Sequence, residues 1–147
     1  MSGIEVDTVV NRPRQEVFDY LARGENLPQW MEAFELVQPT SQDAPAQGKS
    51  YQYKMSRGGE STFQYSDFVP GQRIAWAGPP VQAGPGELSP RGSFDLADQD
   101  GGTYVRLTLD PELGGAMKAA GFVMKRQMKK DAQGDLARLK QLLEGQG

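Results

Sequence analysis

The sequence feature that most constrains the fold is one long amphipathic helix, predicted from Ala116 to Leu143. At 1.5 Å per residue, a helix of about 28 residues is roughly 42 Å long. A stripe of that length needs a broad apolar surface to lie against, so the preceding chain must supply one. At about 100° per residue, the stripe consists of Met117, Gly121, Met124, Met128, Ala132, Leu136, Leu139, Leu142 and Leu143.

This stripe changes character along the helix. Leucines dominate its C-terminal half, while methionine, glycine and alanine occupy its N-terminal half. Leucine fills space in defined rotamers, whereas methionine adapts its shape and small residues leave room. We therefore predict that the leucine end clamps the core. The methionine end forms either the wall of a cavity or ordinary core packing.

Short segments of alternating apolar residues precede the helix and predict an antiparallel sheet. Two short helical segments follow the first strand, one after Pro13 and one from Asn26 to Met31. The order of strand, two helices, meander and long helix is typical of an α+β domain. Such a sheet curls through its own twist and leaves space beneath the helix. The predicted strands are centred on Ile4–Val10, Phe34–Gln38, Tyr51–Met55, Phe63–Tyr65, Ile74–Trp76, Phe94–Leu96 and Val105–Leu109.

Glycine and proline mark the predicted connections. Turns are expected at Arg57–Glu60, at Val69–Gln72 and at Asp98–Gly102. The stretch from Gly78 to Pro90 holds four prolines and three glycines, so it is predicted to be a long loop. Loops of that length are usually functional or disordered. Asp110–Gly115 is expected to link the last strand to the long helix.

Composition excludes several classes of chemistry. The chain has no cysteine and no histidine, which removes disulfides, thiol catalysis and every nucleophile that relies on histidine. No acidic pair has metal-ligand spacing, so neither a metal nor another cofactor is expected. The acids Glu60, Asp67, Glu87, Asp95 and Asp98 fall in or near turns, or on the polar side of strands, and are interpreted as solvated.

Length and charge limit the partners. The 147 residues predict one domain, and the net charge of −3 gives no reason to expect nucleic acid or an anionic membrane. The first residues lack the pattern of a signal peptide, and no apolar run is long enough to cross a bilayer. We therefore expect a cytoplasmic protein without membrane insertion, as a monomer or homodimer.

Four ordered stretches carry a resemblance to a known superfamily. They are Asn11–Leu21 with Pro28–Trp30, Val69–Trp76, Gly101–Leu109 and Asp135–Lys140. In these stretches the chain resembles the START/Bet v 1-like (SRPBCC) superfamily, in particular its polyketide cyclase/dehydrase-like branch. The resemblance implies a helix-grip fold: a curved seven-stranded antiparallel sheet around a long C-terminal helix, with two short helices closing one end.

The same resemblance leaves three classes of function open. The first is the binding of a small hydrophobic molecule, of aromatic, polyketide-like or lipid-like character, in an internal cavity. The second is a polyketide cyclase, aromatase or dehydratase that uses tyrosine, arginine or acidic residues without histidine or metal. The third is a protein-interaction module whose cavity has collapsed. Fold alone does not decide among them, and no catalytic residue can be carried over.

Strand alternation indicates which side chains face the helix. A buried phenol needs a hydrogen-bond partner, which for each tyrosine is either a ligand or a backbone carbonyl. The expected ligand-binding residues are Trp30, Tyr51, Tyr53, Phe63, Tyr65, Trp76, Phe94, Leu107, Met117, Gly121, Met124 and Met128.

The mouth of the pocket is predicted between Trp30 and the Gly78–Pro90 loop, against the methionine end of the helix. A large amphipathic side chain and a long loop are both suited to covering an opening. One flank of the helix is basic, with Lys118, Lys125, Arg126, Lys129 and Lys140. This flank either attracts an acidic partner or headgroup, or is a solvated surface. We favour the solvated surface, because the whole chain is negative.

Overall fold

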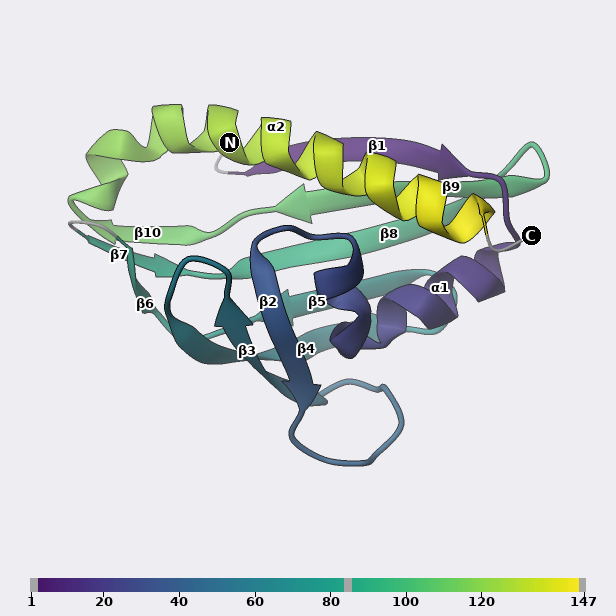
Figure 1. Cartoon of the computed structure of the whole chain (residues 1–147), viewed down its shortest axis with the longest axis horizontal. Coiled ribbons are helices and arrows are strands. Elements are labelled where there is room, and N and C mark those ends of the chain that lie inside the picture. Colours follow the sequence, from purple (N-terminus) through teal and green to yellow (C-terminus); the bar gives the residue numbers. More distant parts are fainter. Residues whose placement is uncertain (1–2, 84–85, 146–147) are drawn as a thin grey trace.

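Seven strands form one antiparallel sheet in the computed structural model, which describes residues 3–83 and 86–145 (Figure 1). Every neighbouring pair in this sheet runs antiparallel. In spatial order the strands are β1 (Ile4–Val10), β9 (Gly102–Leu109), β8 (Arg91–Gln99), β5 (Arg73–Ala77), β4 (Glu60–Val69), β3 (Ser50–Met55) and β2 (Phe34–Pro39).

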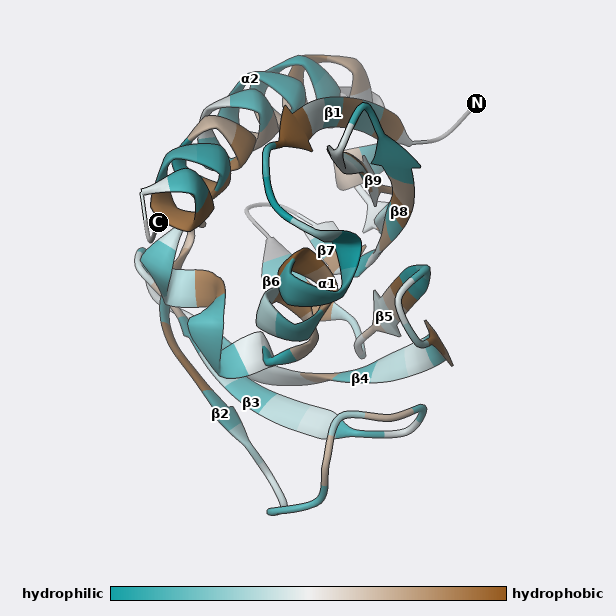
Figure 2. Cartoon of the chain, turned by 90° about the vertical axis from the view of Figure 1, so that its right-hand side faces the viewer, coloured by the Kyte–Doolittle hydropathy of each residue, from teal (hydrophilic) through white to brown (hydrophobic). Residues whose placement is uncertain are grey.

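The long helix α2 (Met117–Glu144) agrees closely with the predicted helix. Figure 2 shows the sheet curling from β1 round to β2, with α2 covering the open side of the curl. The leucine end packs into the core, because Leu136, Leu139 and Leu143 are each 1% exposed or less. The prediction of a leucine clamp is therefore confirmed.

Two short helices close one end of the curled sheet. They are α1 (Arg14–Ala22) and the 3-10 helix η1 (Gly24–Gln29). Pro13 precedes α1, where its missing N–H has no bond to lose. Helix α1 buries Val17 and Phe18 together with two further apolar residues. This arrangement confirms the predicted α+β helix-grip fold.

The predicted hairpin turns lie where glycine supplies unusual backbone angles. Asp100 and Gly101, between β8 and β9, both have positive φ, at 50° and 84°. Two successive residues with positive φ match the right-handed twist of a two-residue hairpin. Gly58 and Gly59, in the longer connection between β3 and β4, also have positive φ, at 83° and 78°.

The segment predicted as a long loop is the main error in the predicted fold. Within Gly78–Pro90 lie β6 (Val81–Ala83) and β7 (Gly86–Ser89), which form a second sheet of order β10-β7-β6 with β10 (Glu112–Gly115). The Pro/Gly-rich composition favours a loop locally, but β7 pairs with β10, a segment far along the chain. Gly84 and Pro85 lie outside the described residues.

The predicted link from Asp110 to Gly115 also needs revision, because its second half is β10. Gly115 has φ of 61° at the end of this strand, just before α2 begins. The small sheet therefore lies beneath the N-terminal end of α2 (Figure 1). Over the described ranges, none of the helices combines the length and apolar character that crossing a bilayer requires.

Candidate functional site

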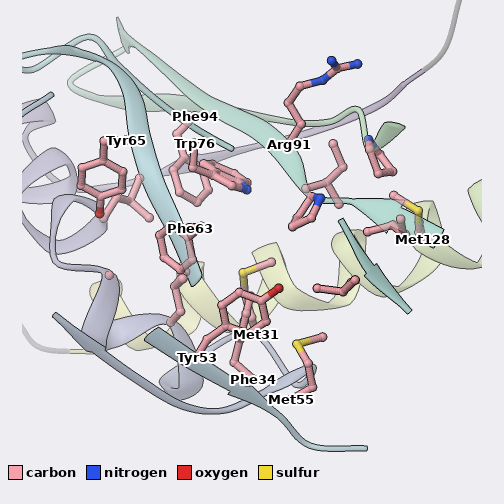
Figure 3. A pocket seen from close by; sticks show the side chains of 18 residues that line it. Met31, Phe34, Tyr53, Met55, Phe63, Tyr65, Trp76, Arg91, Phe94 and Met128 are labelled. Carbon is pink, nitrogen blue, oxygen red and sulfur yellow. The ribbon is translucent and has the colours of Figure 1, made fainter. Parts of the chain in front are cut away.

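A cavity of about 210 Å³ lies between the concave face of the main sheet, η1, the small sheet and α2 (Figure 3). Its wall is mostly aliphatic, aromatic and thioether side chains. The lining residues are Leu21, Gly24, Leu27, Met31, Phe34, Tyr53, Met55, Phe63, Tyr65, Trp76, Val81, Leu88, Pro90, Arg91, Phe94, Leu109, Pro111 and Met128.

Two pairs of aromatic rings form one side of this cavity. The ring centroids of Trp76 and Phe94 are 5.0 Å apart, and those of Tyr53 and Phe63 are 6.0 Å apart. All four side chains come from neighbouring strands of the main sheet. Strand alternation places them on the same concave face. The cavity thus offers aromatic faces and edges to a flat apolar ligand.

The position of Trp76 depends on a glycine opposite it. Trp76 of β5 pairs with Gly92 of β8. A Cβ atom at Gly92 would lie 2.5 Å from Cζ2 of the indole and 2.7 Å from the carbonyl oxygen of Thr108. Only glycine leaves enough room for the indole to lie against β8 at this position, where Trp76 forms part of the cavity wall.

Two buried tyrosines use their phenols for structure. The Tyr65 hydroxyl donates to the Ala22 carbonyl oxygen at 2.8 Å, and the Tyr51 hydroxyl donates to the same oxygen at 3.4 Å. Burial raises the pKa of Tyr65 above its ordinary value, with the neighbouring Tyr51 adding to the effect. Both phenols therefore tie the sheet to the end of α1 rather than facing a ligand.

Tyr53 differs from the other two, because its hydroxyl points into the cavity (Figure 3). Burial raises the pKa of Tyr53, and a hydrogen bond with Ser61, its cross-strand neighbour, partly opposes that rise. The phenol is therefore protonated at neutral pH. A protonated phenol can donate a hydrogen bond to an acceptor in the cavity.

Arg91 contributes its aliphatic stem to the cavity wall but not its charge. Its Nε donates to the Asp110 carbonyl oxygen at 3.0 Å, and its guanidinium lies 3.3 Å from a carboxylate oxygen of Asp110. Figure 3 shows the guanidinium pointing away from the cavity. The cavity is consequently apolar apart from its tyrosine and indole groups.

A wider polar groove adjoins the cavity and shares four wall residues with it: Tyr53, Met55, Val81 and Leu88. The rest of this groove comes from the β3–β4 turn, from the chain at β6, from residues 32–33 and from the middle of α2. Its charged residues are Glu32, Arg57, Glu60, Asp131 and Asp135. The groove is therefore net acidic, while the cavity is apolar.

Asp135 at the edge of the groove is 6% exposed. Burial raises the pKa of this carboxyl, while the Glu32 backbone N–H and the Arg138 guanidinium favour its charged form. Arg138 also donates from Nε to the Trp30 carbonyl oxygen at 3.1 Å. This network fastens the chain after η1 to α2 and keeps that side of the groove in place.

Of the residues expected from the sequence, Tyr53, Phe63, Tyr65, Trp76, Phe94 and Met128 line the cavity. Tyr51 and Leu107 are fully buried and lie outside the lining. The expectation that Trp30 covers an opening is wrong. Trp30 is 1% exposed and packs against Phe94, with 5.8 Å between the ring centroids, because a large indole gains most from full burial.

Three of the predicted residues at the methionine end of α2, Met117, Gly121 and Met124, lie away from the cavity, whereas Met128 lines it. A Cβ atom at Gly121 would meet Cδ1 of Leu113 in β10 at 3.2 Å, and Met117 lies against Gly86 of β7. Met124 is half-buried and is not part of the lining. The small sheet separates this part of α2 from the cavity.

Several lining residues were absent from the sequence-based expectation. Met55 alternates with Tyr51 and Tyr53 in one strand, so its pattern could have identified it. Val81 and Leu88 could not be identified, because their segment was predicted to be a loop. Among the described residues, no group of three or more acidic side chains is arranged to hold a metal ion.

Comparisons with known proteins agree with this architecture. The model of a family described as "Polyketide cyclase / dehydrase and lipid transport" matches residues 1–144. No curated protein sequence matches the chain significantly. A solved protein from Chromobacterium violaceum is 21% identical with a TM-score of 0.67, and the match covers 97% of each chain.

Two further similar structures belong to proteins that are named for an activity. The Zhui aromatase/cyclase from Streptomyces sp. R1128 is 16% identical with a TM-score of 0.74, over 94% of this chain and 90% of that chain. The di-domain ARO/CYC BexL, from the BE-7585A biosynthetic pathway, is 20% identical with a TM-score of 0.75. That match covers 98% of this chain and 47% of BexL. At these identities the similarity shows the fold.

Proposed function

This chain belongs to the polyketide cyclase/dehydrase and lipid transport family, and from that premise we propose that it binds a small aromatic molecule in the cavity between its sheet and α2. The observation that carries the proposal is the cavity of about 210 Å³ with aromatic rings from four neighbouring strands along one side. Ligand pockets are mostly apolar, with a few polar groups that fix orientation. A module with a collapsed cavity is not supported, because the space is open.

The volume limits the size of the ligand. An apolar cavity of about 150 Å³ holds benzene, whereas pockets for drug-sized molecules are about 300–1,000 Å³. A cavity of about 210 Å³ therefore suits one or two fused rings. A longer molecule would have to extend past Tyr53 and Val81 into the adjoining groove.

Polarity sets the orientation of the ligand. The Tyr53 hydroxyl lies where the cavity meets the groove, since this residue contributes to both walls. A ligand acceptor such as a carbonyl oxygen would take the hydrogen bond from this phenol, while the rings pack against Trp76 and Phe94. We place the entrance between the β3–β4 turn, β6 and the middle of α2, rather than beside Trp30.

The test uses 2-acetonaphthone, which carries one carbonyl acceptor, and 2-ethylnaphthalene, which has none. The chain has two tryptophans, so Trp30→Phe leaves Trp76 as the reporter of binding by fluorescence. Both probes should quench Trp76. Tyr53→Phe should lower the affinity for the ketone by about 2- to 12-fold and leave the affinity for the hydrocarbon unchanged. Failure of both probes to bind would refute the proposal.

A control variant separates the cavity from other sites. Trp76→Phe leaves Trp30, which is buried outside the lining. In that variant the same probes should quench much less, because the remaining indole does not line the cavity. Equal quenching of both reporters would mean that the probes bind elsewhere.

A second candidate function is catalysis of a cyclase or dehydratase type. The specific observation in its favour is the Tyr53 phenol, which burial keeps protonated inside an apolar cavity. Such a group can hydrogen-bond an oxygen that gains negative charge during reaction. The test is incubation with a β-hydroxy naphthyl ketone, which loses one water molecule to give the enone, and detection of the enone by mass spectrometry. Turnover lost in Tyr53→Phe, with binding retained, would favour the enzyme over the carrier.

A further inference from the structure

The N-terminal half of α2 carries a concentrated positive charge. Residues 117–130, here called the basic half of α2, contain no aspartate or glutamate. The net charge of the whole chain is −3, so removing the +5 of this segment leaves −8 on the rest. The low net charge therefore conceals a strongly basic surface. Its five cations are Lys118, Lys125, Arg126, Lys129 and Lys130.

Two large apolar side chains stand among these cations. Phe122 is 76% exposed and Val123 is 70% exposed. Phe122 lies four residues from both Lys118 and Arg126, so the three side chains share one helical face. Scattered apolar residues on a surface are normal, but an aromatic ring flanked by cations on one helix is a specific combination.

The packing of α2 explains why these residues face outward. Gly121 packs against Leu113 of β10, where a Cβ atom would lie 3.2 Å from Cδ1 of the leucine. Each residue turns a helix by about 100°, so this contact directs Phe122 and Val123 away from the small sheet. The outward direction is thus built into the fold.

We propose that the basic half of α2 docks the protein on an anionic lipid surface. In this arrangement Phe122 and Val123 enter the headgroup region, and the lysine and arginine side chains contact lipid phosphates and carboxylates. Helices that lie in a membrane interface combine apolar side chains with a lysine- and arginine-rich polar face. Anionic lipids attract such cations from within about one Debye length.

Charge complementarity favours an anionic lipid surface, rather than a second copy of the chain, as the partner of the basic half of α2. Two copies joined through this face would bring ten cations together, if each contributes its +5, without an acidic side chain from residues 117–130 to offset them. A lipid surface supplies many negative groups and an apolar layer at once. The surface shares Met128 alone with the cavity wall, so docking and ligand binding can be tested separately.

The experiment is co-sedimentation of the full chain with vesicles. Vesicles of phosphatidylcholine with phosphatidylserine should bind the protein, whereas vesicles of phosphatidylcholine alone should bind it weakly. Binding should decline as salt is added, because salt screens the charges. Lys129→Gln should weaken binding about fivefold, and Phe122→Ser should weaken it about tenfold.

Matched control variants lie elsewhere on the surface. Leu36→Ser removes another exposed apolar side chain, 47% exposed on β2. Arg23→Gln removes another exposed cation, at the end of α1. Neither should change vesicle binding. Circular dichroism melts of all four variants show whether each is folded.

Loss of binding in Phe122→Ser and Lys129→Gln, with both controls unchanged, would support lipid docking. Absence of vesicle binding, or an equal loss in the controls, would overturn it. Binding to single-stranded DNA or to an acidic protein, without binding to vesicles, would also overturn it and assign the surface to another polyanion. Phe122→Ser should keep the parent affinity for 2-acetonaphthone, so failure of docking and failure of the cavity proposal are distinguishable.

Discussion

Replacing Gly92 with alanine is expected to destabilise the fold and displace the aromatic wall of the cavity. The new Cβ atom would lie 2.5 Å from Cζ2 of Trp76 and 2.7 Å from the Thr108 carbonyl oxygen. The second contact is with the backbone of β9, which is paired to a strand on each side, so it cannot move aside like a flexible side chain. The backbone of Gly92 is not in the left-handed region, so crowding alone causes the effect.

The size of this effect follows from the contacts. Forcing an extra methyl group into a packed interior typically costs about 1–3 kcal/mol. The indole is the movable partner, and the free space beside it is the cavity. We therefore expect Trp76 to shift into the cavity, which would lower the affinity for 2-acetonaphthone as well as the free energy of unfolding.

Gly134 provides a matched control with the same chemical change. It lies within α2, and a Cβ atom there would meet nothing within 4 Å. Alanine in a helix interior is more favourable than glycine by about 0.5–1 kcal/mol. Gly134→Ala should therefore stabilise the protein, whereas Gly92→Ala should destabilise it.

Urea denaturation followed by far-UV circular dichroism measures both changes. A loss of about 2 kcal/mol should lower the midpoint by about 1 M, for a slope of about 2 kcal/mol per molar. Trp76 emission in the Trp30→Phe background reports the displaced indole. If Gly92→Ala unfolds at the parent midpoint with unchanged emission, the steric reasoning about Gly92 is refuted.

Three further changes test the core and the titrating groups. Leu139→Ala should cost about 2–5 kcal/mol by calorimetry, because Leu139 is 0% exposed; a change in ligand preference would contradict its role as core. The hydrogen bond from Lys140 lowers the pKa of Glu144 in the folded protein. The Glu144 carboxylate therefore contributes to folding stability above its ordinary pKa of 4.5, and this contribution is lost as pH falls through the folded-state pKa. The melting temperature of Glu144→Gln should then be lower than that of the parent at pH 7 and equal to it in acid. A difference in melting temperature that does not change with pH would argue against this. The phenols have raised pKa values, so their contribution to stability is present below the ordinary value of 10.0 and is lost as pH rises, and phenolate absorbance should develop only above that value. An ultraviolet titration curve like that of free tyrosine would contradict the raised pKa values. The tyrosines concerned are Tyr20, Tyr51, Tyr53, Tyr65 and Tyr104.

Periodicity in the sequence predicted the elements and their buried faces. The spacing of Leu136, Leu139 and Leu143 placed one side of α2 in the core, and all three are buried. Alternation in β3 and β4 placed Tyr53 and Phe63 on the concave face, where they line the cavity. These patterns are local, because burying one face of a helix or strand requires apolar residues at fixed intervals.

The same patterns do not show which residues of a buried face line a cavity and which are covered by another element. Tyr51 and Tyr53 belong to one face of β3, yet only Tyr53 lines the cavity. A Cβ atom at Gly24 of η1 would lie 2.9 Å from the Tyr51 ring, so η1 covers that tyrosine and leaves its neighbour open. The position of η1 over the sheet is a tertiary contact, and strand alternation cannot predict it.

The sequence by itself determined the helix, the curled sheet and the apolar face between them, because apolar residues at regular spacing within a short segment indicate which face is buried. Only the tertiary structure decided where that face remains unfilled. The pairing of β7 with β10 keeps Met117 and Gly121 away from the cavity, brings in Val81 and Leu88, and directs Phe122 outward. Such pairing joins segments far apart in the chain, so its effect depends on distances in space that no local pattern of residues specifies.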